Sequence, residues 1–158
     1  MSPNFFLIVG IVCALIALVG GIWWWMSVKN TPFSDISTVT IQFSYGIIRA
    51  EIASSPLKHA AGLSSRPVLA PDTGMLFVFS SPQQPAFWMK GMRFPLDFIW
   101  LRNNVVVDLN KNVPIPQNIL DFNIIRPEHS IDMVLEVNVG TIEKMGVKVG
   151  DEVKILNP

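Results

Sequence analysis

The sequence has little cysteine and no excess of charge. Among its 158 residues there is one cysteine, and 12 Lys and Arg residues balance 12 Asp and Glu residues. A single cysteine excludes a disulfide framework and a cysteine-rich zinc site. The balanced charge argues against a nucleic-acid-binding protein, because such a protein needs a basic excess to neutralise phosphates. With 50% hydrophobic residues, the chain is also too apolar to be disordered.

Motifs of the common enzyme classes are absent as well. The sequence contains no P-loop, no GxGxxG, no HExxH and no GxSxG motif. Its two histidines, His59 and His129, are far apart and are predicted to face solvent, one on a helix and one in a loop. We therefore expect no metal site and no cofactor.

A long run without charge stands near the beginning of the chain. Residues 5–28 contain no charged residue and no proline. As a helix rising about 1.5 Å per residue, this run would cross the roughly 30 Å hydrocarbon core of a bilayer. A cleaved signal peptide is the alternative, but no A-x-A site follows the run and no basic segment precedes it. The sequence thus predicts a transmembrane anchor over residues 1–30, which contacts membrane lipid through residues 5–28, and a linker over residues 31–37.

The remaining residues, 38–158, have the pattern of one β-rich domain, because short apolar runs alternate with turn residues. Strands are predicted over residues 39–43, 47–53, 75–79, 86–90, 96–101, 105–109, 131–138 and 150–156. Short helices are predicted over residues 56–63 and 141–145, and a long loop over residues 111–126. The pattern predicts a mainly β fold, an antiparallel β-sandwich or a barrel-like domain with one or two short helices.

The ends of the two short helices carry typical capping residues. Ser55 is the predicted N-cap of the first helix, since Pro56 follows it, and Gly62 is its predicted end. Thr141 is the predicted N-cap of the second helix, and Gly146 is its predicted end.

Two of the predicted strands carry candidate site residues. With a period of two, Trp88 and Lys90 share one face of the strand over residues 86–90. Trp88 is expected to be a core residue, and the wall of a binding cleft is the alternative. In the next strand, Asp97 shares its face with Ile99 and Leu101, so its carboxylate must be exposed at the strand end, or paired, or left with a raised pKa. We expect it to be buried or half-buried and paired with a basic residue.

Arg66 is the predicted partner of Asp97, because a guanidinium can hold a carboxylate with two parallel hydrogen bonds. A structural pair is expected rather than a catalytic one. Glu136 is a second candidate acid, although Asp132 and Asn138 on the same strand face predict a position in solvent.

Six segments together resemble the family of domain of unknown function 192, also called uncharacterised protein family 0127. They are Gly62-Leu63 with Arg66, DTGMLFVF at residues 72–79, FWMK at 87–90, PLD at 95–97, VLE at 134–136 with Gly140, and GVKVGD at 146–151. The chain departs from the family pattern at Ser64, where methionine is usual. It departs again at Gly91-Met92, where a polar Asn-Thr pair is usual.

The resemblance implies a compact antiparallel β-sandwich, often behind a signal sequence or an anchor, and it implies no activity. It also implies that the domain lies outside the cytoplasm of a single-pass membrane protein, although Lys29 after the apolar run favours the opposite orientation. Two functions stay open. The first is a module of the cell envelope that binds a small ligand or an envelope protein. The second is an enzyme that uses Asp97 or Glu136 as acid or base, with Arg66 orienting the substrate.

Overall fold

The computed structural model describes residues 37–118 and 124–156. The predicted anchor over residues 1–30 and nearly all of the predicted linker lie outside these residues. Neither helix of the described chain is long and apolar enough to cross a membrane.

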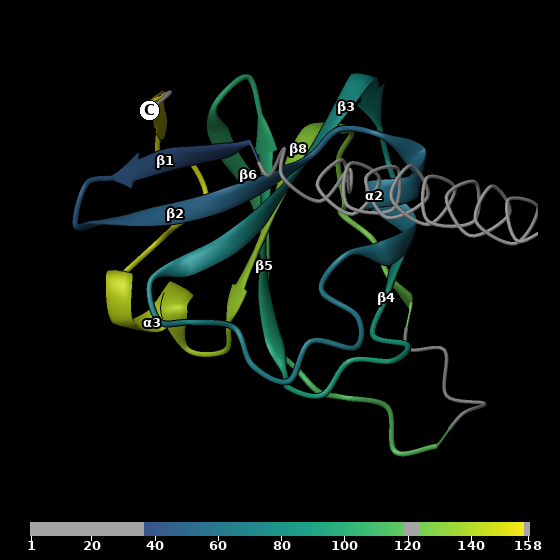
Figure 1. Cartoon of the computed structure of the whole chain (residues 1–158). Helices are drawn as coiled ribbons and strands as arrows, with labels where there is room; N and C mark the ends of the chain where they lie inside the picture. Colours follow the sequence, from purple (N-terminus) through teal and green to yellow (C-terminus); the bar gives the residue numbers. More distant parts are fainter. Residues whose placement is uncertain (1–36, 119–123, 157–158) are drawn as a thin grey trace, which may run out of the picture. The chain divides into compact units, whose positions relative to one another are not determined.

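Seven strands form one sheet in the order β6-β5-β8-β3-β2-β1-β9 (Figure 1). They are β1 (Thr38–Phe43), β2 (Gly46–Ala53), β3 (Thr73–Gln83), β5 (Leu96–Arg102), β6 (Val105–Val113), β8 (Ile131–Asn138) and β9 (Lys154–Leu156). A second, two-stranded sheet joins β4 (Phe87–Trp88) to β7 (Ile124–Ile125). The prediction of a mainly β fold is confirmed.

The two edges of the large sheet meet in the segment just before β9. The Val106 N–H donates to the Asp151 carbonyl at 2.9 Å, and the Val153 N–H donates to the Asn104 carbonyl at 2.8 Å. Val105 and Glu152 also form an isolated antiparallel bridge. The sheet therefore closes on itself, as in the barrel-like form of the prediction.

The sheet is mixed, so the prediction of a wholly antiparallel sheet is wrong. Strands β2 and β3 run parallel, with Arg49 opposite Thr73 and Ala53 opposite Phe77. Parallel neighbours need a long crossover connection, usually with a helix in it. Helix α2 (Pro56–Ala61) lies in the connection between these two strands and supplies that crossover.

The two helices begin and end at small residues. Ser55 caps α2, because its Oγ accepts the Lys58 N–H at 3.3 Å, and Gly62 ends the helix with φ +49°. In α3 (Thr141–Met145) the predicted cap is wrong: Gly140 occupies the N-cap position without a side-chain bond, and Thr141 is the first helical residue. Gly146, at φ +64°, ends α3 as predicted.

Strand β6 continues to Val113, into the region predicted to be a loop, and β7 occupies another part of it. The pairing of β5 with β6 shifts between Leu96 and Phe98, so that two residues of β6, Lys111 and Asn112, lie opposite the single residue Asp97. Asn112 has φ +55° there. This β-bulge interrupts the alternation of side chains, which explains why the sequence pattern predicted the first part of the strand and not its end.

Both faces of the central strand β5 are buried. Ile99 and Leu101 pack into one hydrophobic cluster together with Ile142 of α3, whereas Phe98 and Trp100 pack into a second cluster. Figure 1 shows α3 on one side of the sheet and α2 with β4 on the other. The second cluster lies on the side of α2 and β4, and the candidate site is found there.

Candidate functional site

The sheet face beneath α2 and β4 is hollowed by a pocket of about 210 Å³. Helix α2 and the turn after it form one wall, β3 and β4 supply aromatic rings, and β8 supplies one acidic side chain. We call it the aromatic pocket; it is lined by residues 59–64, Phe77, Phe79, residues 85–88, Met92, Leu96 and Glu136. An apolar cavity of about 150 Å³ is enough to bind benzene. The aromatic pocket can therefore hold a small aromatic molecule.

Glu136 lines the aromatic pocket from the middle of β8 and is only 5% exposed. No residue of the described chain donates a hydrogen bond to its carboxyl or forms an ion pair with it. Burial among apolar groups raises the pKa of Glu136 to about 8. At neutral pH the carboxyl is therefore mostly protonated, and it can donate a hydrogen bond or give up a proton.

The solvent position predicted for Glu136 is wrong, because the polar neighbours on its strand face lie at the strand ends. Asp132 accepts the Asn103 N–H at 3.0 Å with its Oδ2, and Asn138 donates to the Leu69 carbonyl at 3.0 Å with its Nδ2. Both side chains are half-buried and bound to backbone groups. The middle of the same face, where Glu136 lies, is covered by the α2 and β4 segments.

Four aromatic side chains form much of the pocket wall: Phe77, Phe79, Phe87 and Trp88. Phe77 and Phe87 meet edge to face, with ring centroids 5.0 Å apart and planes at 88°. Phe79 lies 6.5 Å from Phe87 and 5.0 Å from the ring of His59. The strand period could have predicted that Phe77 and Phe79 share a face, but the sequence held no signal that they face Glu136.

His59 is half-buried at the pocket, so its predicted position in solvent is wrong, whereas His129 is exposed as predicted. The His59 Nε2 lies 2.9 Å from the Ala53 carbonyl oxygen. Its ring also packs against Phe77, with centroids 5.8 Å apart. These contacts hold the imidazole at the wall of the pocket.

Trp88 is 52% exposed, so its expected place in the core is wrong. Its side chain lines the aromatic pocket, which is the alternative position of a cleft wall. Strand β4 is held there by β7, where Ile124 lies opposite Trp88. Ser64 and Met92, two positions at which the chain departs from the family pattern, line the same pocket.

Asp97 is 1% exposed, as predicted, but its partners are backbone groups and not Arg66. Its Oδ1 accepts the Asn112 N–H at 2.8 Å, and its Oδ2 accepts the Ile142 N–H at 3.0 Å. The bulge in β6 and the start of α3 present these two N–H groups. Backbone donors thus satisfy the carboxylate without a basic side chain, and Asp97 is absent from the pocket lining.

Arg66 pairs instead with Glu51 of β2. Its Nη1 and Nη2 donate to the two carboxylate oxygens at 2.6 and 2.7 Å. The side-chain hydrogen bond from Arg66 lowers the pKa of Glu51. Lys90 is exposed in the turn after β4, and only its carbonyl takes part in a described contact, with the Ser64 hydroxyl at 3.0 Å. The structure thus brings Trp88 and Glu136 together and leaves Arg66, Lys90 and Asp97 outside the pocket.

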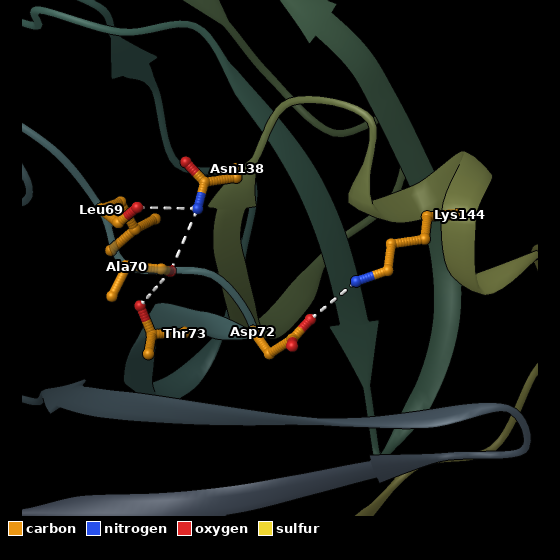
Figure 2. A network of polar contacts seen from close by, with 6 residues as sticks. All are labelled: Leu69, Ala70, Asp72, Thr73, Asn138 and Lys144. Carbon is orange, nitrogen blue, oxygen red and sulfur yellow. Dashed lines mark hydrogen bonds and ion pairs between the residues drawn. The ribbon is translucent and has the colours of Figure 1, made fainter.

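A second hollow, of about 490 Å³, lies between the β1–β2 hairpin, α3 and the segment before β3. Figure 2 shows the polar contacts beside it: Lys144 pairs with Asp72 at 3.1 Å, and Asn138 holds the carbonyls of Leu69 and Ala70. The Lys144 and Asp72 side chains are 70% and 59% exposed, so their attraction is weakened by water. These contacts join the segment before β3 to α3 and to the end of β8, and we assign them a structural role.

The fold and the pocket define a small, closed β domain with an internal site of ligand size. The chain belongs to the family of domain of unknown function 192, described as uncharacterized ACR, which it matches over residues 38–155. This match confirms the resemblance drawn from the sequence. No curated protein matches the chain.

Two crystal structures of bacterial proteins are similar to this fold. One is a protein of Sinorhizobium meliloti 1021, proposed to be a transcription regulator. It has 30% sequence identity and a TM-score of 0.65 over 75% of this chain and 92% of its own. The other is a protein of unknown function from Novosphingobium aromaticivorans DSM 12444. It has 28% identity and a TM-score of 0.66 over 78% of this chain and 89% of its own.

Proposed function

We propose that the protein is a membrane-anchored module of the cell envelope that binds a small ligand in the aromatic pocket. One observation carries the proposal: a mostly apolar pocket of about 210 Å³ contains a buried carboxyl, that of Glu136, without a partner in the described chain. An apolar pocket with few polar groups is typical of a ligand site. No group of the described chain donates to this carboxyl, so a ligand in the pocket that bonds or pairs with it gains affinity.

Binding can be tested with three probes of similar size: benzyl alcohol, benzylammonium and benzoate. The full-length chain, in lipid nanodiscs and labelled with 5-fluorotryptophan, reports on the pocket through the fluorine signal of Trp88, which Trp88→Phe assigns. Trp100 is buried and bonded to Asn110, so its signal serves as an internal reference. We expect at least one probe to shift the Trp88 signal saturably at millimolar concentration or below.

Two variants distinguish binding in the pocket from partition into the lipid. Ala86 lines the aromatic pocket, so Ala86→Trp should block it and abolish the shift. Ala70 is exposed and lies outside the lining, so Ala70→Trp should leave the shift unchanged. If no probe shifts the Trp88 signal, or if the shift survives in Ala86→Trp, the proposed function is wrong.

The anchor and the orientation are part of the same proposal. The uncharged residues 5–28 support a membrane tether, and the resemblance to exported relatives supports a domain outside the cytoplasm. The full-length chain should sediment with membranes, and removal of residues 1–30 should release a soluble, folded domain. Recovery of the intact chain in the soluble fraction after gentle lysis would contradict the tether.

Orientation can be tested with one introduced cysteine. Ser44 is exposed in the turn between β1 and β2, so Ser44→Cys should be harmless once Cys13 is replaced by serine. On intact cells this cysteine should react with an impermeant maleimide, and a chain with neither cysteine is the blank. Labelling only after lysis would place the domain in the cytoplasm.

An acid–base enzyme is the second candidate function, and the pKa of Glu136 favours it. A carboxyl with a pKa of about 8 remains protonated at neutral pH and can act as a general acid. Asp97 and Arg66, the other residues of this hypothesis, do not line the pocket. Turnover of a bound molecule that stops in Glu136→Gln, while its binding persists, would support catalysis over binding alone.

A further inference from the structure

We infer that the ligand of the aromatic pocket is a small organic cation, with an ammonium group on an apolar or aromatic body. The inference rests on the proposed function and adds the chemical class of the ligand. Its basis is the set of groups that the pocket brings together: one buried carboxyl, four aromatic side chains and no basic Lys or Arg among the described residues of the lining.

The carboxyl of Glu136 is the first part of the cation site. It is 5% exposed, lines the pocket and makes no hydrogen bond or ion pair within the described chain. In the free protein it avoids a buried charge by keeping its proton. A bound ammonium group would replace that proton as the partner of the carboxylate. Binding then releases one proton from the Glu136 carboxyl and leaves an ammonium–carboxylate pair. The net charge of the pocket is zero before and after binding.

The aromatic side chains are the second part. Phe77, Phe79, Phe87 and Trp88 all line the pocket. The faces of aromatic rings are electron-rich and attract a cation within about 6 Å, most strongly where water is excluded. A neutral ligand of the same shape gains no comparable attraction from these rings.

The side chains around Glu136 disfavour an anionic ligand. Helix α2 contributes His59, whose Nε2 is engaged with the Ala53 carbonyl oxygen, and β3 and β4 contribute only aromatic side chains to the lining. Leu96 of β5 also lines the pocket, and Phe98 lies opposite Glu136 in the sheet. A carboxylate ligand would thus meet an acidic group without a Lys or Arg to neutralise it, so benzoate should bind weakest.

The three benzyl probes test this inference on the same full-length chain. Benzylammonium should bind tighter than benzyl alcohol, and its affinity should rise by about tenfold per pH unit until the pKa of Glu136 is reached. Benzyl alcohol accepts a hydrogen bond from the protonated carboxyl, so its affinity should be constant and then fall above that pKa. Below this pKa only the affinity for benzylammonium should change with pH, and above it only the affinity for benzyl alcohol should fall, so the two pH profiles decide between a cationic and a neutral ligand.

Glu136→Gln preserves the size of the side chain and removes its charge. In this variant the affinity for benzylammonium should fall by about tenfold to a hundredfold and lose its pH dependence, whereas benzyl alcohol should bind nearly as before. Glu143→Gln, an exposed site on α3, is the matched control and should change neither affinity. His59→Asn should leave the rise with pH in place, since the rise is assigned to Glu136.

The outcomes separate the inference from the proposed function. If benzyl alcohol or benzoate binds in the pocket more tightly than benzylammonium, or if the affinity for benzylammonium does not depend on pH, the cation inference is wrong and the binding module remains. If no probe binds, the proposed function is wrong as well. Tight, pH-dependent binding of benzylammonium that Glu136→Gln removes would support both.

Discussion

Replacement of Glu136 by glutamine should stabilise the protein, and the gain should depend on pH. The pKa of Glu136 rises from 4.5 in the unfolded chain to about 8 in the fold, because burial penalises the charged form. Between these two values the unfolded chain loses the proton while the folded chain keeps it. The free energy of unfolding therefore falls as the pH rises through this window, and glutamine, which has no proton to lose, avoids the loss.

The magnitude follows from the width of the window. At about 1.4 kcal/mol per pH unit, a pKa rise from 4.5 to about 8 corresponds to a loss of about 5 kcal/mol from wild type, as an upper estimate. The difference between Glu136→Gln and wild type should be smallest near pH 4.5 and should grow until about pH 8, where it levels off. A loss of this size is comparable with the whole stability of a small domain.

Urea unfolding of the full-length chain in mild detergent, followed by tryptophan fluorescence across this pH window, measures the difference. Other titrating groups are common to both proteins, so they cancel when the two are compared. Glu143→Gln should show no such trend, because its side chain is exposed. A difference that is the same at every pH, or a Glu136→Gln variant less stable than wild type near pH 8, would refute the reasoning.

Three further predictions concern the fold around the site, and urea unfolding measures each. Asp97→Asn should cost about 2–3 kcal/mol, because an amide can accept only one of the two backbone N–H bonds and turns its NH₂ toward the other. Gly74→Ala should cost about 1–3 kcal/mol, since its Cβ would lie 2.5 Å from the Glu136 carbonyl oxygen, whereas Gly46→Ala should cost less because the flexible end of Met145 can move. The coupling of Arg66 to Glu51 in a double-mutant cycle should stay below about 1 kcal/mol and disappear in acid, as the pH falls through the lowered pKa of Glu51.

Each of these predictions has an outcome that would contradict it. An Asp97→Asn variant as stable as wild type would mean that the two backbone bonds contribute nothing. Equal losses for Gly74→Ala and Gly46→Ala would show that the close approach of β3 to β8 has no special cost. A coupling between Arg66 and Glu51 that persists in acid would contradict its assignment to an ionised carboxylate.

Local features of the fold were predictable because neighbours in the sequence cause them. Ser55 followed by Pro56 begins α2, and Asn103-Asn104, both at positive φ, turn the chain between β5 and β6. Apolar residues occupy both faces of β5, which is the local signal of a strand buried on both sides, and the structure buries nearly all of it. One wrong prediction also has a local cause: the bulge at Asn112 breaks the period of two, and the end of β6 that contains it was predicted as a loop.

The residues that make up the site were harder to predict, because their neighbours come from distant parts of the chain. The sequence by itself determined that β5 is buried, that Asp97 is buried with it, and that the domain belongs to its family. Only the tertiary structure decided that Asp97 is held by the N–H groups of Asn112 and Ile142, and that Arg66 reaches Glu51. It also decided that Glu136, on a face with polar ends, lies under α2 and the β4 segment. The physical reason is that burial and the pKa depend on what covers a strand face, and the period of the strand contains no information about the segment that covers it.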